Sequence, residues 1–209
     1  MAFYFDVFRT NQEAYDREQD LKQRLFSGWV GNGNVLDVGF ASSPNRYLRG
    51  FVVGVDKADV KPPSNYSSVF VKDISFGRLS FDDGFFSGVC MGDVLEHMDR
   101  PFEALLEVNR LLKDGGILAL SIPNVFYIPH AFRSSTGWYE EADDMSFSEH
   151  VYSFSIYNIR LLLSRTGFEF QELKGYRIKI PFVKIAYCST KVPFWVSTQL
   201  LIKARKVGE

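Results

Sequence analysis

The sequence has little cysteine and no cluster of metal-binding side chains. Only Cys90 and Cys188 are cysteines among 209 residues, and neither belongs to a Cys-x-x-Cys motif or to a His-rich cluster with the spacing of metal ligands. Two cysteines are too few for the disulfide framework of a small secreted fold. The sequence therefore predicts a protein of a reducing compartment that binds no metal ion.

A targeting segment and a long apolar run are also missing. Residues 1–9 show neither the basic and apolar regions of a signal peptide nor an Arg- and Ser-rich transit pattern. The longest uncharged stretch, residues 115–132, is interrupted by Pro123 and Pro129, so it fits a buried strand and a loop better than a membrane span. We therefore expect a cytoplasmic protein.

The chain has no large excess of charge of one sign. Its 24 Lys and Arg against 25 Asp and Glu argue against a general nucleic-acid-binding protein. Residues 1–173 carry 16 basic and 24 acidic side chains, whereas residues 174–209 carry eight basic and one acidic. Aromatic residues accompany the lysines of this last segment. The segment could form a peripheral contact with an anionic membrane or a homodimer contact. Alternatively, its aromatic side chains pack on the domain's own core while its lysines face water.

Short apolar runs alternate with stretches of helical periodicity. The runs have the length and composition of buried strands and span residues 35–39, 51–56, 69–74, 85–91 and 117–122. Helical spacing and capping residues predict helices from Asn11 to about Phe26, over residues 100–113 and after Ser155, and a brief one starting at residues 42–44. Two more strands are expected at residues 168–173 and 197–206. This alternation predicts an α/β fold with a largely parallel sheet.

The side chains that follow the predicted strands are the best candidates for a binding site, because ligands of open parallel sheets bind beyond the carboxyl ends of the strands. These residues are Gly39, Asp56, Asp73, Gly92 and Asp93. Asp56 follows Asp37 by 19 residues, close to the spacing of about 20 at which an acidic residue binds a ribose. A Gly-x-Gly-x-x-Gly fingerprint and a phosphate-binding loop are absent from the sequence. An adenosine-containing ligand fits better than a dinucleotide or a nucleoside triphosphate.

Six segments resemble, in their order, the class I S-adenosylmethionine-dependent methyltransferases that act on small molecules, especially those of the quinone-biosynthesis type. The segments are VLDVGFASSP (35–44), VVGVD (52–56), KDI (72–74), FDDGFFSGVCMGDVLEHMDRP (81–101), LLEVNRLLKDGGILALSIPN (105–124) and HVYSFSIYNIRLLLSRTGF (150–168). The resemblance implies a Rossmann-like, doubly wound, mostly parallel sheet of seven strands with an antiparallel last strand. A single domain, 1–209, would comprise a helical extension (1–33), a cofactor-binding core (34–173), a substrate lid (125–154) and basic C-terminal strands (174–209).

The resemblance also implies roles for single residues. The turn from Asp37 through Gly39 to Ala41 would pass the methionine part of the cofactor, although Asp37 could instead bond backbone amides of the turn. Asp56 would bind the ribose, Asp73 the adenine amino group with Ile74 beside the ring, and residues 92–94 would lie near the methionine amine. The candidate cofactor-binding residues are Asp37, Gly39, Ala41, Asp56, Lys57, Asp73, Ile74, Gly92, Asp93 and Val94. For Asp56 and Asp73, the alternative is a carboxylate that caps a loop.

Two residues depart from the family's Asp-x-Gly-x-Gly-x-Gly motif, because Ala41 and Ser43 occupy its later glycine positions. The methyl group of Ala41 lies where backbone and cofactor would approach closely, and a positive φ would be costly for Ser43. We therefore expect weaker cofactor binding or a turn of different shape. A catalytically inactive binding or scaffold domain is the alternative function.

His97 and His150 are the candidate general bases, because histidine titrates near neutral pH; a structural hydrogen bond is the alternative for each. The acidic stretch 138–144 would select a cationic acceptor or form a solvated loop. A sulfonium already activates its methyl group, so transfer needs chiefly an acceptor held in place. The sequence predicts methyl transfer from S-adenosylmethionine to oxygen, nitrogen or carbon of a small molecule. Aminopropyl transfer is less favoured, because a second pair of carboxylates is missing.

Overall fold

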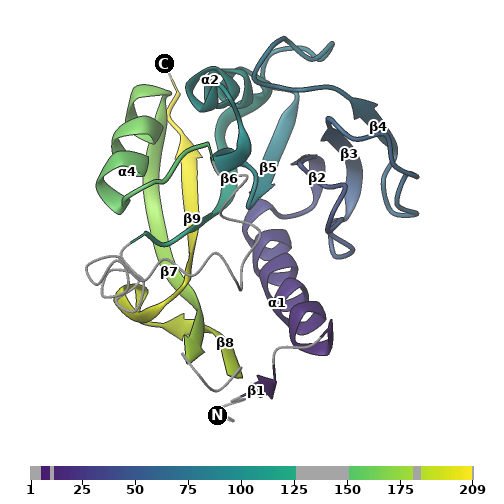
Figure 1. Ribbon diagram of the computed structural model, residues 1–209. Coiled ribbons are helices and arrows are strands. Elements are labelled where there is room, and N and C mark those ends of the chain that lie inside the picture. The colour runs from purple at the N-terminus through teal and green to yellow at the C-terminus, as the bar shows by residue number, and fades with distance from the viewer. Residues whose placement is uncertain (1–5, 10–11, 126–150, 181–184, 209) are drawn as a thin grey trace.

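A computed structural model of the chain describes residues 6–9, 12–125, 151–180 and 185–208, and these form one sheet with helices on both faces (Figure 1). The strands are β1 (Asp6–Arg9), β2 (Gly33–Val38), β3 (Gly50–Asp56), β4 (Ser68–Val71), β5 (Phe86–Gly92), β6 (Leu112–Pro123), β7 (Phe168–Ile180), β8 (Ile185–Val192) and β9 (Gln199–Lys206). The helices are α1 (Gln12–Val30), α2 (Pro101–Leu111) and α4 (Ile156–Arg165), with the short 3-10 helices η1 (Leu95–His97) and η3 (Phe194–Val196). Within the described ranges, no helix is long and apolar enough to cross a membrane.

Strands β4, β3, β2, β5 and β6 pair in parallel and form one half of the sheet. The chain runs outward from β2 through β3 to β4 and then returns to β5 on the other side of β2. The strand order therefore reverses between β2 and β5, which is where open parallel sheets bind their ligands. The predicted Rossmann-like, mostly parallel α/β fold is confirmed.

The other half of the sheet is antiparallel. Strand β9 lies between β6 and β7 and runs antiparallel to both, as predicted for the last strand. The prediction of seven strands is wrong, because the described residues form nine, in the order β1-β8-β7-β9-β6-β5-β2-β3-β4. Strand β8 pairs with β7, and β1 pairs with β8, so the two additional strands extend one edge. Pairing between the two ends of the chain has no signature in a local sequence pattern.

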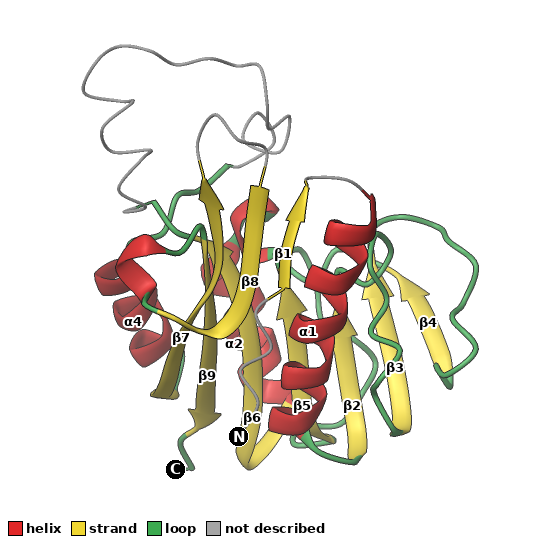
Figure 2. Ribbon diagram, turned by 90° about the horizontal axis from the view of Figure 1, so that it is seen from below, coloured by secondary structure: helices red, strands yellow, loops and turns green. Residues whose placement is uncertain are grey.

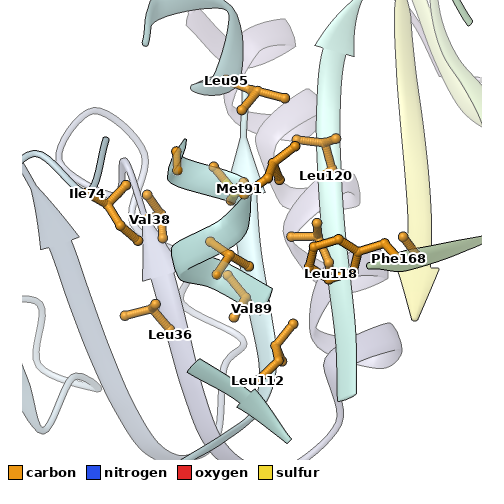
Figure 3. Packing of buried hydrophobic residues seen from close by; sticks show 14 of the residues in the cluster. Leu36, Val38, Ile74, Val89, Met91, Leu95, Leu112, Leu118, Leu120 and Phe168 are labelled. Carbon is orange, nitrogen blue, oxygen red and sulfur yellow. The ribbon is translucent and has the colours of Figure 1, made fainter. Parts of the chain in front are cut away.

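Alternate residues of each strand contact different helices, because side chains of a strand point to opposite faces. Helices α2 and α4 cover one face and α1 covers the other (Figure 2). On the α2 and α4 face, Leu36 and Val38 of β2 join a core with Val89 and Met91 of β5 (Figure 3). On the α1 face, Phe26 and Val30 of the helix pack with a second set, Val35, Val52, Cys90 and Leu201. Asp37 and Cys90 therefore face α1.

The helix ends follow local signals at three places. Pro101 begins α2, and the Ser155 hydroxyl accepts a hydrogen bond of 3.0 Å from the Asn158 amide at the start of α4, so both predicted helices are confirmed. Helix α1 continues to Val30, past the expected end near Phe26, and Gly31 follows with φ of 70°. A left-handed residue after the last turn is the usual end of a helix.

The brief helix predicted to start at residues 42–44 is wrong. Residues 39–49 form turns without a helix. The Asn45 amide donates to the Tyr66 hydroxyl at 2.9 Å, and the Asn45 side chain accepts from the Tyr47 amide at 3.0 Å. An asparagine side chain that bonds nearby backbone competes with helical hydrogen bonds, and the bond to Tyr66, which follows β3, holds the segment as a loop.

Candidate active site

A pocket of about 430 Å³ opens where the strand order reverses, between the carboxyl ends of β2 and β5 and the facing side of α1. Its polar lining comes from both ends of the sequence: α1 supplies Glu18, Gln19, Lys22 and Gln23, and the C-terminal strands supply Arg177 and Gln199. The central strands and η1 supply Asp37, Gly39, Gly92, Asp93, Glu96 and His97. The expected ligand-binding edge of the sheet is thus a polar pocket.

The turn after β2 requires glycine at position 39. Gly39 has φ of 76°, and a Cβ there would lie 2.5 Å from the Val94 side chain. Neither Ala41 nor Ser43 adopts a positive φ, so the backbone cost expected for Ser43 does not arise. The Ser43 hydroxyl instead accepts from Gln23 at 3.1 Å and donates to Gln19 at 3.2 Å. The turn is therefore fastened to α1.

Asp37 holds the loop that follows this turn. Its buried carboxyl accepts hydrogen bonds from the Tyr66 hydroxyl and, at 3.4 Å, from the Asn45 amide. Burial raises the pKa of Asp37 to about 6, although the bonds from Tyr66 and Asn45 and the charge of Lys22 oppose that rise. These contacts match the alternative role of shaping the turn. Asp37 also lines the pocket, and a direct contact with the cofactor stays a prediction.

The residues expected to hold the adenosine lie outside this pocket. The Asp56 carboxylate, at the end of β3, accepts from the Ala41 and Ala58 amides at 2.9 Å each, and Asp73 accepts from the Ser75 amide at 2.9 Å. Lys57 is exposed, and Ile74 is buried at 3% exposure in the core of Figure 3. The pocket is lined by Asp37, Gly39, Gly92 and Asp93, which were expected on the methionine side, and the contacts with both parts of the cofactor stay predictions.

Asp93 lies directly after β5 and contacts side chains of three other elements, α1, β6 and β9. Its carboxylate lies 2.6 Å from Lys22 Nζ of α1, accepts from the Ser121 hydroxyl of β6 at 2.6 Å, and accepts from the Gln199 amide of β9 at 3.3 Å. Burial alone would raise its pKa, but the charge of Lys22 and the hydrogen bonds from Lys22 and Ser121 lower the pKa below its usual value. Asp93 is therefore ionised. Its φ of 54° is unusual for a residue with a side chain, and such strain gathers at functional sites.

Three kinds of site residue were missed by the sequence analysis. Residues of α1 were missed because that helix was interpreted as an extension, and Arg177 and Gln199 because their strands lie far along the chain. Arg177 of β7 pairs with Glu18 at 2.7 Å, so one of the basic C-terminal residues belongs to the pocket wall. Glu96 was missed although it stands beside His97 in the Leu-Glu-His stretch that carried the resemblance.

Glu96 and His97 lie in η1, directly after β5. The Glu96 side chain is buried at 1% exposure, and among the described residues neither of its carboxyl oxygens has a hydrogen-bond partner. Burial, and then the negative charge of Asp93, raise the pKa of Glu96 to about 8, against the opposing effects of its own backbone amide and of the charge of Lys22. His97 lines the same pocket, and its role as a base stays a prediction. His150 and the acidic stretch 138–144 lie outside the described residues.

Solved structures share the fold at low sequence identity. An S-adenosylmethionine-dependent methyltransferase from Mesorhizobium loti is 15% identical with a TM-score of 0.60, over 90% of this chain and 98% of that one. A 1,6-didemethyltoxoflavin-N1-methyltransferase from Burkholderia thailandensis, solved with 1,6-didemethyltoxoflavin and S-adenosylhomocysteine, is 16% identical with a TM-score of 0.61, over 94% and 81%. The [4+2]-cyclase SpnF is 17% identical with a TM-score of 0.63, over 99% and 88%. The fold alone therefore does not decide the reaction.

Sequence comparison assigns the family. No curated protein sequence matches the chain. A family model described as a methyltransferase domain matches residues 10–173, from the start of α1 into β7. This match confirms the resemblance to class I small-molecule methyltransferases, which rested on segments between residues 35 and 168. Because the model spans well over half of the sequence, the chain belongs to the methyltransferase domain family.

Proposed function

We propose that this protein transfers a methyl group from S-adenosylmethionine to an oxygen, nitrogen or carbon atom of a small molecule. The observation that carries the proposal is the polar pocket at the reversal of strand order, with Gly39 on one side and an ionised Asp93 on the other. No nucleic-acid partner is expected.

S-adenosylmethionine fits the residues of this site. Gly39 lines the pocket, and Val94 fills the space beside its α-carbon, so the turn after β2 lies against the residues that follow β5. The carboxylate of Asp93 suits the positive charges of a sulfonium and of a methionine ammonium group. In this proposal Gly39 and Asp93 hold the methionine part, while Asp56 binds the ribose and Asp73 the adenine. The bound cofactor supplies a methyl group on a positively charged sulfur.

The rest of the pocket wall holds and orients the acceptor. The Lys22–Asp93 and Arg177–Glu18 ion pairs fasten α1 to the sheet, with the paired atoms 2.6 and 2.7 Å apart. The Arg177–Glu18 pair cancels its own charge, so this part of the wall offers hydrogen bonds without a strong net charge. Such a wall suits a small polar acceptor, and orientation within it can supply several kcal/mol of the barrier reduction.

The alternative is a methyltransferase-like domain without turnover, which the methyl group of Ala41 and the cyclase relative favour. Calorimetric titration with S-adenosylmethionine and S-adenosylhomocysteine tests cofactor binding, and we expect both to bind. An absence of heat at millimolar ligand would overturn the proposal. If the protein binds S-adenosylmethionine but forms no S-adenosylhomocysteine with any of a panel of phenols, amines and activated carbon acids, the inactive domain is favoured instead.

A further inference from the structure

We propose that Glu96 is the general base of this site and that the acceptor atom carries a proton, as in a hydroxyl group or an amine. This inference rests on the proposed function and deepens it by naming the class of acceptor. It is carried by the position of the Glu96 carboxyl in the pocket and by its lack of a partner there.

The backbone around Glu96 is fixed from two sides. Its carbonyl accepts hydrogen bonds from the amides of Val151 and Tyr152, at 2.9 and 3.1 Å, in the segment that leads into α4. The amide of His97 donates to the Val94 carbonyl at 3.1 Å and closes the turn of η1. The preceding Leu95 is fully buried in the core. These bonds fix the backbone from which the Glu96 side chain extends, and Glu96 is one of the residues that line the pocket.

Three other acidic groups that line the pocket have partners. Asp93 is paired with Lys22, Glu18 with Arg177, and Asp37 with the hydroxyl of Tyr66. Glu96 differs, because among the described residues both of its carboxyl oxygens are unbonded. Leaving a buried polar group without a partner destabilises the folded protein. A carboxyl retained at that cost in a pocket is a candidate for contact with a ligand.

The surroundings of Glu96 favour uptake of a proton. Burial disfavours the charged form of Glu96, and Asp93, directly after β5, repels that form. The backbone amide of Glu96 and the charge of Lys22 oppose these effects, and the pKa is about 8. The other titratable or charged groups that line the pocket are His97 of η1, Asp37 of β2, Cys90 of β5, Tyr15 of α1 and the Arg177–Glu18 pair between β7 and α1. A pKa close to the operating pH is what a general base needs.

The proposed step balances in charge and electrons. The Glu96 carboxylate takes the proton of the acceptor's O–H or N–H group, and the electron pair left on that atom forms the bond to the methyl carbon. The electron pair of the broken carbon–sulfur bond stays on sulfur, which becomes neutral. One positive and one negative charge are thus removed from a poorly hydrated pocket, which favours the forward direction. The proton passes to water when the product leaves.

Proton counting during cofactor binding tests this placement without an acceptor. Calorimetric titrations at pH 7 in two buffers of different ionisation enthalpy report the protons released per ligand bound. A sulfonium near Glu96 lowers its pKa, so S-adenosylmethionine should release most of one proton more than S-adenosylhomocysteine, whose sulfur is uncharged. Both ligands carry the same amino-acid and adenosine groups, so other contributions cancel in the difference.

Two variants and one pH series decide the outcome. The difference in proton release between the two ligands should vanish in Glu96→Gln. It should persist in Glu103→Gln, a matched change at an exposed position of α2. In the unsubstituted protein the difference should also vanish well above pH 8, where Glu96 is already ionised. Equal proton counts, or a difference that survives in Glu96→Gln or at high pH, overturn this inference while cofactor binding stands. Absence of binding by both ligands overturns the proposed function and this inference with it.

Discussion

Lys22 Nζ lies 2.6 Å from Asp93 Oδ2, and this ion pair connects the middle of α1 to the carboxyl end of β5. The pair places an N-terminal helix against the strand that ends beside the proposed methyl donor. Asp93 also bonds Ser121 and Gln199, so removal of Lys22 leaves a charge that is only partly compensated.

We expect Lys22→Ala to lower the free energy of unfolding by about 1–3 kcal/mol, because a partly buried carboxylate loses its charged partner. Urea unfolding at pH 7 measures this. The matched control is Arg24→Ala, which removes an exposed cation paired with Asp20 on the same helix and should cost about 0–1 kcal/mol. Equal losses of unfolding free energy in the two variants would show that the Lys22–Asp93 pair stabilises the fold no more than an exposed ion pair does.

Gly39→Ala should impair both folding and cofactor binding, because the new Cβ would lie 2.5 Å from Val94 at a residue whose φ is 76°. The control is Gly115→Ala, where φ is 73° and nothing lies within 4 Å. That control isolates backbone strain, which costs about 1–2 kcal/mol. A larger loss of unfolding free energy and weaker S-adenosylhomocysteine binding are expected for Gly39→Ala alone. A similar loss of unfolding free energy in both variants would show that residue 39 does not lie against Val94.

Asp56→Ala should weaken S-adenosylhomocysteine binding on the order of 10- to 150-fold, the equivalent of about 1.5–3 kcal/mol for hydrogen bonds to a charged acceptor. Thermal unfolding must be followed in parallel, because Asp56 also bonds the Ala41 and Ala58 amides. Asp59→Ala, at an exposed neighbouring position, should leave affinity unchanged. If Asp56→Ala binds as tightly as the parent protein, Asp56 serves the loop and not the ribose.

Stability should fall as the pH rises toward 8. The pKa of Glu96 is raised from 4.5 to about 8 in the folded protein, so its contribution is fully present below about pH 4.5 and is lost as the pH approaches 8. The slope is at most about 1.4 kcal/mol per pH unit for one proton. Asp37, with a pKa of about 6, acts in the same direction at lower pH, so the window from pH 6 to 8 isolates Glu96. Unfolding free energies of Glu96→Gln should be flatter across this window, and an equal slope would contradict the raised pKa.

The membrane contact expected of residues 174–209 stays a prediction, and within the described part of that segment the exposed aromatic side chains lie in η3. Among the described residues, four cations of the segment pair on the domain itself: Lys174 with Glu172, Arg177 with Glu18, Arg205 with Glu169 and Lys206 with Asp114. Tyr176 is fully buried, whereas Phe194 and Trp195 are 41% and 54% exposed and contact each other edge to face.

We expect Trp195→Ala to reduce co-sedimentation with anionic vesicles, because an exposed tryptophan favours the membrane interface. Tyr157→Ala, at a residue 74% exposed on α4, is the control and should have no effect. Conversion of a dimer to a monomer by Trp195→Ala, seen by light scattering, would assign η3 to a homodimer contact instead. No change in either measurement would contradict both the membrane contact and the homodimer contact at η3.

Local patterns predicted what depends on local physics. Val35 to Val38 and Val52 to Val55 are short apolar runs, and they form central strands of the sheet. Ser155 and Gly167 mark the ends of α4 because capping and a positive φ are properties of single residues. The place where the strand order reverses followed from the order of these elements, so the edge of the sheet that carries Gly39 and Gly92 was predicted correctly.

What depends on distant contacts was not predicted. The segment after β2 becomes a loop because Asn45 meets Tyr66, a residue beyond the next strand. Strand β1 exists through pairing with β8 at the other end of the chain. Glu96 is buried in a turn whose carbonyl is bonded by Val151 and Tyr152. In each case the deciding neighbour is far away in sequence, so a local pattern carries no trace of it.

The pocket wall is assembled from two stretches of the chain, one within the family match and one beyond it. The family match ends at residue 173, so it includes Lys22 and Asp93 but excludes Arg177 and Gln199, which approach from β7 and β9. Under the proposed function, a change in the C-terminal strands would alter the molecule that is methylated and would leave unchanged the residues proposed to bind the methyl donor. Variation among relatives should therefore concentrate after residue 173, and chimaeras joined there would carry acceptor preference with the C-terminal piece.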